Sequence, residues 1–396
     1  MRTVAVIGKN FGDEGKGLVT ASLCFSAKKP LVIRNNGGAQ SGHTVENEKT
    51  KARFVHRQTG SGAEYGAATL WAEEFHPDLF QLSKELGEFQ NAFGFDPPLF
   101  SLEETNITVI DDVILNMALE TQRGESRHGS CAMGINACCE RIEAGYMLTV
   151  GEVKSLSKKE LAKRLTSIRS EYSMKRAKEL GISSGNPYYE MLLDGNIIEN
   201  FSEEACVAAE YVTTVTASPE WLNSFDLAVF ETGQGLLLDK DYLPFAPHLT
   251  ASETGVSGAT RFLEKRGLSL DEAIYVSRSY VTRHGAGPLP FECERGELKG
   301  VKADKTNIEN QWQGKIRYAR HGDYESFLAA LKEDIKKAKI LPSLALTHLD
   351  ETYGKILFTG GDIPVNELVS ALSPDFRAIY ASYDKQTLLP LTKKAD

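Results

Sequence analysis

The first seventeen residues constrain the fold most strongly. Residues 3–7 (TVAVI) form a short apolar run rich in β-branched side chains, which is typical of a buried strand. The run leads directly into residues 8–17 (GKNFGDEGKG), and a helical pattern follows. Glycines between a strand and a helix let the backbone approach phosphate oxygens, and the helix N-terminus adds N–H donors. This segment therefore predicts a strand, a phosphate-binding loop and a helix.

The loop differs from the common GxxxxGK[ST] phosphate loop. Six residues separate Gly8 from Gly15, and Gly17 stands where that motif has Ser or Thr. A plain strand-to-helix turn needs one or two glycines, so four glycines with Lys16 favour phosphate binding. Asp13 is unexpected in a loop built for anions. A carboxylate there is best explained as a metal ligand or as a general base.

Similar apolar runs alternate with longer helical patterns along the chain. Further strands are expected at 31–33, 107–110, 227–230, 274–276, 344–346 and 356–358, and helices at 80–89, 158–179 and 325–339. This alternation predicts an α/β fold with a large, mostly parallel central sheet flanked by helices, similar to the P-loop nucleotide hydrolases, with helical excursions.

The 396 residues are expected to form a single large α/β nucleotide-binding domain over 1–396. A helical insertion is expected around 153–190, and residues 351–396 receive no assignment. The net charge of −9 argues against binding to nucleic-acid polymers, which need a basic surface. No apolar run approaches the roughly 18 residues of a membrane span, so a cytoplasmic protein is expected.

Four further segments place polar residues after strands. They are 37–45 (GGAQSGHTV), 230–239 (FETGQGLLLD), 280–292 (YVTRHGAGPLPFE) and 346–350 (LTHLD). His43 can donate a hydrogen bond to a transferring phosphoryl group, although a lone histidine is more often structural. Gln234 lies between glycines at a strand end, where open α/β sheets bind ligands. The two oxygens of Asp350 match two donors of guanine, and a helix cap there is about equally common.

In this order the five segments resemble the motifs of the adenylosuccinate synthetase family. The family patterns are W-G-D-E-G-K-G-K, G-G-x-N-A-G-H-T-V, F-E-G-A-Q-G-x-x-L-D, Y-T-T-R-V-G-x-G-P-F-P-T-E and L-T-K-L-D. The resemblance implies a nucleoside-triphosphate-dependent ligase. It would phosphorylate the 6-oxygen of IMP or a related 6-oxopurine nucleotide, and the amine of aspartate or another amino acid would then displace the phosphate.

The resemblance also implies roles for individual residues. The catalytic set would be Asp13, His43 and Gln234, with Asp13 and the backbone of Gly42 holding Mg²⁺. The nucleoside triphosphate, GTP or ATP, would contact Gly12, Gly15, Lys16, Gly17, Gly42, Thr44, His348 and Asp350. The nucleoside monophosphate would contact Gln40, Ser130, Cys131, Gln234, Thr250 and Arg317. The amino acid would contact Lys315 and Arg317, and the protein would be a homodimer.

Several positions depart from the family patterns. Cys131 stands for a Thr on the monophosphate, and Met133 stands for an Arg near the amino acid. The Arg that crosses to the neighbouring subunit aligns with Gly145, and Arg141 is the nearest substitute. Lys315 keeps a positive charge but cannot pair with a carboxylate through two parallel bonds as Arg does.

Two alternatives follow from these departures. The first is a phage-type enzyme that makes a 2-aminoadenylosuccinate from GMP or dGMP with ATP. Such relatives typically lack the acid equivalent to Asp13, so its presence favours an IMP-type substrate. The second is a non-catalytic nucleotide-binding regulator. The presence of both Asp13 and His43 argues against it, because a protein that only binds nucleotide needs neither.

Overall fold

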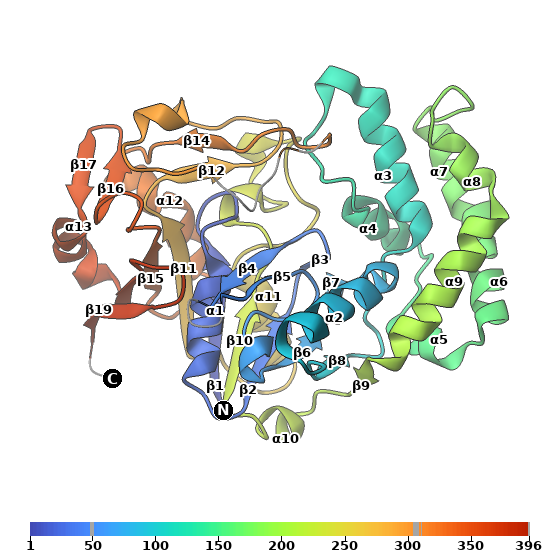
Figure 1. Ribbon diagram of the computed structural model, residues 1–396, viewed down its shortest axis with the longest axis horizontal. Coiled ribbons are helices and arrows are strands. Elements are labelled where there is room, and N and C mark those ends of the chain that lie inside the picture. Colours follow the sequence, from blue (N-terminus) through green and yellow to red (C-terminus); the bar gives the residue numbers. More distant parts are fainter. Residues whose placement is uncertain (48–50, 304–308, 310, 395–396) are drawn as a thin grey trace.

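The computed structural model describes residues 1–47, 51–303, 309 and 311–394. Within these residues, ten strands form one central sheet (Figure 1). In spatial order they are β19 (Leu389–Lys393), β18 (Ala378–Ala381), β15 (Ser343–Thr347), β11 (Glu272–Arg278), β1 (Arg2–Gly8), β10 (Leu227–Glu231), β2 (Pro30–Arg34), β6 (Ala68–Trp71), β8 (Leu99–Ser101) and β9 (Thr213–Thr214). Every neighbouring pair is parallel except β18 with β19, which confirms the predicted fold class.

Both faces of the sheet are buried under helices. Along β1, Ala5 and Ile7 belong to one buried apolar cluster, and Val4 and Val6 belong to another, because successive side chains point to opposite faces. The helix α1 (Lys16–Phe25) packs on the second cluster. The first cluster is covered by α11 (Ser257–Glu264), α12 (Tyr324–Ile335) and α13 (Val365–Leu372). This double burial explains why the strands are almost continuously apolar.

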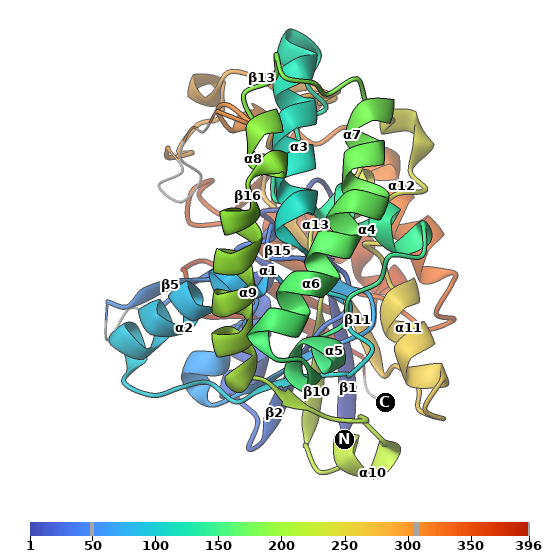
Figure 2. The ribbon, with the colours of Figure 1, turned by 90° about the vertical axis from the view of Figure 1, so that its right-hand side faces the viewer.

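A helical region connects β8 to β9, which are adjacent parallel strands. Its helices are α3 (Ile110–Arg123), α4 (Ile135–Glu143), α5 (Val150–Ser155), α6 (Lys158–Ile168), α7 (Met174–Glu179), α8 (Tyr189–Leu193) and α9 (Gly195–Glu210). They gather beside one edge of the sheet, where α9 packs against α2 (Leu79–Phe93) (Figures 1 and 2). The expected insertion at 153–190 lies inside this larger region, and the division into domains stays a prediction.

Two strand predictions need correction. Residues 107–110 have no place in the described sheets, because Ile110 begins α3 and the backbone N–H of Val109 donates to Oδ2 of Asp112 at 3.0 Å. This bond caps the N-terminus of the helix, so the apolar run leads into α3 instead of forming a strand. Residues 356–358 do form a strand, β16 (Lys355–Phe358), but it pairs with β17 (Gly361–Pro364) in a hairpin outside the central sheet.

Short sheets surround the carboxyl ends of the central strands. They are β3 (Gly37–Gly38) with β7 (Phe75–His76), β4 (His43–Glu46) with β5 (Arg53–His56), and β12 (Val281–Arg283) with β14 (Arg317–Ala319) and β13 (Glu292–Cys293). Beyond residue 351, β18 and β19 complete one edge of the central sheet. Among the described residues, no helix has both the length and the apolar character that crossing a membrane requires.

Candidate active site

A cavity of about 930 Å³ opens where the loops after β1, β2 and β10 meet. Its volume is in the range of roughly 300–1,000 Å³ that small-molecule sites occupy. The carboxyl ends of parallel strands lie at the same edge of the sheet, so the loops that follow them are brought together. The opposite wall comes from the helical region between β8 and β9.

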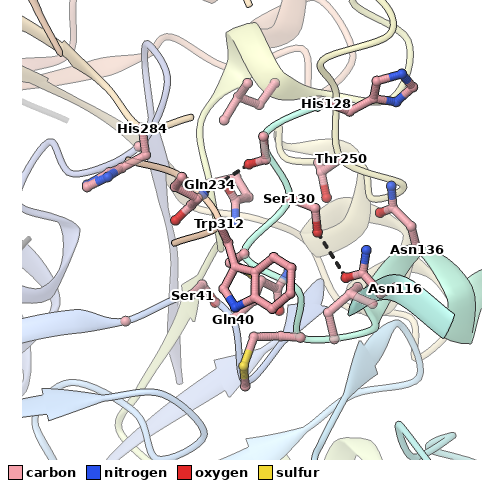
Figure 3. Close-up of a pocket in the computed structure, with 18 of the residues that line it drawn as sticks. Gln40, Ser41, Asn116, His128, Ser130, Asn136, Gln234, Thr250, His284 and Trp312 are labelled. Atoms are coloured by element: carbon pink, nitrogen blue, oxygen red, sulfur yellow. Dashed lines mark hydrogen bonds between the residues drawn. The ribbon is translucent and has the colours of Figure 1, made fainter. Parts of the chain in front are cut away.

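Most of the residues predicted to be functional line this cavity. They are Gly12, Asp13, Lys16, Gln40, Gly42, His43, Ser130, Cys131, Gln234 and Thr250. Figure 3 shows Gln40, Ser130, Gln234 and Thr250 arranged around the same space, although they come from four different segments of the chain.

Glu14 holds the loop after β1 in its closed conformation. Oε1 of Glu14 accepts the backbone N–H groups of Asn10 at 3.0 Å and Gly12 at 2.8 Å. Nζ of Lys16 donates to Oε2 of Glu14 at 3.0 Å and to the carbonyl of Gln234 at 2.6 Å. A Cβ at Gly8 would lie 2.4 Å from Oε2 of Glu14, so this position has room for glycine alone. The loop is therefore preorganised around buried charges.

Asp13 projects from this loop beside a histidine that the sequence did not single out. Its φ of 59° is in the left-handed region, which is uncommon for a residue with a side chain. Oδ2 of Asp13 lies 2.9 Å from Nε2 of His284. Burial alone would raise the pKa of Asp13, but His284, Arg278 and Lys16 together hold that pKa well below its usual range. Asp13 is therefore an ionised carboxylate at neutral pH.

His43 is held by a buried carboxylate. Nδ1 of His43 lies 2.8 Å from Oε1 of Glu231, the last residue of β10. Oε2 of Glu231 accepts from Nη1 of Arg34 and from the backbone N–H of Ser61, both at 3.1 Å. Burial lowers the pKa of His43 to about 4, against the opposing effect of Glu231. Nε2 of His43 is buried without a hydrogen-bond partner among the described residues.

Asparagines organise the other end of the cavity. Oγ of Ser130 donates to Oδ1 of Asn116 at 2.9 Å (Figure 3). Oδ1 of Asn136 accepts the backbone N–H of Ala251 at 3.2 Å. The first bond holds the loop at Ser130 to α3, and the second holds the loop at Thr250 to α4. The sequence gave no signal for Asn116 or Asn136, because a single asparagine is compatible with many local roles.

Two predicted amino-acid ligands lie outside the cavity lining. Lys315 is exposed, and its ammonium lies 3.9 Å from Glu309. Arg317 pairs with Glu292 through Nε at 2.7 Å and also through Nη2. Its Nη1 donates to the carbonyl of Gly287 at 2.7 Å. The roles of Lys315 and Arg317 therefore stay predictions.

Five predicted triphosphate contacts also lie outside the lining. Gly15 precedes α1 with a φ of 92°, and a Cβ at Gly17 would lie 2.9 Å from the carbonyl oxygen of Thr44. Gly17 and Thr44 thus bring α1 against β4, whereas Gly15 lies against the side chain of Thr347 at the end of β15. His348 and Asp350 follow β15, and Asp350 is exposed to solvent. A base-reading role for them is not tested by this geometry.

Arg141 does not replace the missing arginine. Nε of Arg141 donates to Oδ1 of Asp112 at 3.0 Å, and Nη2 donates to the carbonyl of Ile107 at 2.8 Å. The side chain is fully buried between α3 and α4, where it joins the two helices. Arg141 is therefore not a substitute for the arginine that crosses to the neighbouring subunit, since a buried arginine needs its carboxylate partner.

A family model described as adenylosuccinate synthetase matches residues 5–354. The chain belongs to the adenylosuccinate synthetase family. It is 28% identical over 309 residues to adenylosuccinate synthetase from Alteromonas mediterranea, a match that covers 76% of this chain and 68% of that protein. It is 27% identical over 366 residues to the Microcystis aeruginosa enzyme, covering 88% of this chain and 74% of that protein.

Two solved structures share this fold. Fully ligated adenylosuccinate synthetase from Plasmodium falciparum superposes with a TM-score of 0.71 at 16% identity, covering 99% of this chain and 100% of that chain. A cyanophage S-2L succinoaminodeoxyadenylate synthetase, bound to dGMP and dATP, gives a TM-score of 0.62 at 13% identity, covering 98% of this chain and 95% of that chain. The predicted family is thus confirmed, and the chain is an enzyme of the carbon–nitrogen ligase class.

Proposed function

We propose that this ligase joins an amino acid to a 6-oxopurine nucleoside monophosphate, with IMP as the purine substrate and GTP as the phosphoryl donor. The observation that carries the proposal is the convergence of Asp13 and His43, from different loops, on one cavity. The first is an ionised carboxylate, and the second is an imidazole braced by a buried acid. A protein that only senses nucleotides has no need of this pair.

In the first step, Asp13 accepts the N1 proton of the purine. The released electron pair moves to O6, which attacks the γ-phosphorus and displaces the nucleoside diphosphate. Gln234 lines the same cavity as Asp13. Its amide donates to the oxyanion that develops at O6. Nε2 of His43, which has no hydrogen-bond partner among the described residues, faces the phosphoryl group. The negative charge of the phosphoryl group favours protonation of His43, and Glu231 stabilises the imidazolium that results.

In the second step, the amine of the amino acid attacks C6. The C6–O6 bond breaks, inorganic phosphate leaves with the oxygen, and the departing phosphate takes up the proton that the amine nitrogen loses. Phosphorylation makes this step feasible, because phosphate is a far better leaving group than oxide. The cavity contributes position more than covalent chemistry, as is usual in phosphoryl transfer.

The residues present fit Mg²⁺ held jointly with phosphate. No cluster of three or more His, Cys, Asp or Glu side chains suits a metal in the described part of the chain. A single ionised carboxylate beside a phosphate loop matches the way Mg²⁺ is bound through one or two carboxylates and substrate phosphates. Asp13 and the carbonyl of Gly42 would hold the ion, which neutralises phosphate charge when it is bound.

Phosphate release tests the proposal directly. Purified protein is supplied with GTP or ATP, with IMP, GMP or dGMP, and with a panel of amino acids that begins with aspartate. Turnover that requires both a 6-oxopurine nucleotide and an amine supports the ligase. Tight nucleotide binding without turnover in every combination would instead establish a nucleotide-binding regulator. Light scattering of the same sample tests the homodimer that the family resemblance implies.

A further inference from the structure

The lysines and arginines that line the cavity are mostly neutralised by acids of the same chain. Four of them have a carboxylate partner: Lys16 with Glu14 at 3.0 Å, Lys84 with Glu88 at 4.0 Å, Arg123 with Glu120 at 2.6 Å, and Arg176 with Glu140 at 2.8 Å. Arg57 and Arg283 also line the cavity, and neither forms an ion pair within the described part of the chain. These two guanidinium groups therefore carry charges that no ion-paired acid offsets.

Arg283 is held by the protein interior. It is 1% exposed, its Nη1 donates to the carbonyl of Pro288 at 2.6 Å, and its Nη2 donates to the carbonyl of His248 at 3.1 Å. Its guanidinium lies 4.6 Å from the centroid of the Phe11 ring. Arg57 is exposed, and its side chain donates no hydrogen bond to another described residue. Of the two arginines, Arg57 is therefore the one whose donors are available to a ligand.

The loop after β5 sets the position of Arg57. The backbone N–H groups of Arg57 and Gln58 each donate to Oε1 of Glu85 at 3.0 Å, so this buried acid fixes the loop backbone. A Cβ at Gly42 would lie 3.6 Å from Nη1 of Arg57. Burial raises the pKa of the Cys131 thiol, and the charge of Arg57 partly opposes that rise. The guanidinium therefore lies close to two loops, the one at Gly42 and the one at Cys131.

The phosphate site expected around Ser130 lacks a cation of its own. Gln40, Ser130 and Thr250 line the cavity there, and their side chains are neutral. Arg317, the cation expected at the same phosphate, pairs with Glu292 outside the cavity lining. Phosphate is bound most strongly through charge-assisted hydrogen bonds, and a planar guanidinium supplies two parallel donors for them.

We propose that Arg57 binds the 5′-phosphate of the purine nucleotide that accepts the phosphoryl group. Its guanidinium adds the positive charge to a phosphate site whose other side chains are neutral. The inference rests on the proposed function, because it takes a nucleoside monophosphate as the ligand at the cavity wall around Ser130. The loop after β1 and the N-terminus of α1 offer a separate site for the phosphates of the nucleoside triphosphate.

Titration calorimetry of IMP and of inosine, which lacks the phosphate, tests the inference without triphosphate or amine. We expect the wild-type protein to bind IMP more tightly than inosine. Arg57→Ala should lower the affinity for IMP by roughly ten- to a hundredfold and leave that for inosine unchanged. Arg57→Lys keeps the charge without the planar fork of donors, so it should retain part of the affinity for IMP. Equal losses for IMP and inosine in Arg57→Ala, or equal affinities in the wild-type protein, would overturn the inference.

Arg53→Ala is the matched control. Arg53 lies on β5, is exposed, pairs with Glu46 at 3.5 Å and does not line the cavity, so the ratio of the two affinities should stay at its wild-type value. Thermal unfolding checks each variant, and Arg57→Gln replaces Arg57→Ala if the latter does not fold. An equal fall of the IMP-to-inosine ratio in Arg53→Ala would show a general effect of surface charge and overturn the inference.

Steady-state kinetics separate the 5′-phosphate from the phosphates of the nucleoside triphosphate. Arg57→Ala should raise the KM for IMP and leave kcat and the KM for GTP close to their wild-type values. A raised KM for GTP with an unchanged KM for IMP would assign Arg57 to the triphosphate and overturn the inference. Because the calorimetry needs no turnover, loss of the preference for IMP over inosine in Arg57→Ala supports the inference even if no amine is ligated.

Discussion

Nδ1 of His43 lies 2.8 Å from Oε1 of Glu231, and Arg34 donates to the other oxygen of the same carboxylate. Glu231 orients the imidazole by pairing with Nδ1, as the aspartate of a Ser-His-Asp triad does with its histidine. We expect Glu231→Gln to lower kcat by roughly a hundredfold or more with little change in the KM for nucleoside triphosphate. Steady-state kinetics measure both constants. A kcat equal to that of the wild-type enzyme would show that His43 acts without Glu231.

Asp13→Ala and His43→Ala should each abolish turnover and leave the fold intact. Both side chains face the cavity, so neither truncation opens a hole in the apolar core. The measurement is phosphate release, with thermal unfolding as the check on folding. Wild-type rates for either variant would remove the mechanism proposed above.

Gly8→Ala should disable the first loop. The added methyl group would lie 2.4 Å from Oε2 of Glu14 and 2.6 Å from the carbonyl oxygen of Gln234, so the buried charges must shift. We expect a large loss of nucleoside-triphosphate affinity, measured by calorimetry. Gly87→Ala is the matched control, because nothing lies within 4 Å of a Cβ there and α2 gains up to about 1 kcal/mol of helix propensity. Equal affinities in the two variants would contradict this account of the loop.

Arg141→Met should destabilise the protein without weakening nucleotide binding. The substitution leaves Asp112 buried without its cation, and losses of this kind cost about 3–5 kcal/mol. Urea denaturation measures the free energy of unfolding. Under conditions where the variant is folded, its KM for the monophosphate should match that of the wild-type enzyme. A raised KM with normal stability would show that Arg141 acts on nucleotide binding after all.

Ionisation of Asp78 should lower the free energy of unfolding as the pH rises. It caps α2 by accepting the N–H groups of Phe80 and Gln81, and burial raises the pKa of Asp78 to about 6 despite those bonds. Because its pKa in the folded state exceeds that of the unfolded chain, its contribution is complete below pH 3.8 and is lost as the pH rises through 6. The loss is on the order of 3 kcal/mol.

Asp78→Asn keeps the cap and removes the titration. The difference in unfolding free energy between Asp78→Asn and the wild-type protein, measured in urea from pH 4 to pH 8, should therefore grow in favour of the variant. A constant difference across that range would show that Asp78 keeps its ordinary pKa in the folded protein.

The loops could be predicted from the sequence because each glycine cluster directly follows a strand, and parallel strands end at one edge. The buried charged residues that support the candidate site were harder to predict. Glu231 had a signal, since an acid ending an apolar strand must be paired when it is buried. His284 also had one, as a histidine where the family has valine. Arg141 had none, because its partner Asp112 becomes close only through the packing of α3 against α4.

The long helical region leaves the sheet at β8 and returns at the neighbouring strand β9. Its two attachment points are therefore side by side, and its residues supply the cavity wall around Ser130 while the phosphate loops belong to the sheet itself. The loop with Lys16 and the cavity wall around Ser130 are thus encoded in separate stretches of the gene. The departures from the family patterns at Cys131 and Met133 lie in this wall, whereas Lys16 and Glu231 lie in segments outside the helical region. With the function proposed above, this separation allows the substrate that accepts the phosphoryl group to change while the residues that bind the nucleoside triphosphate stay the same.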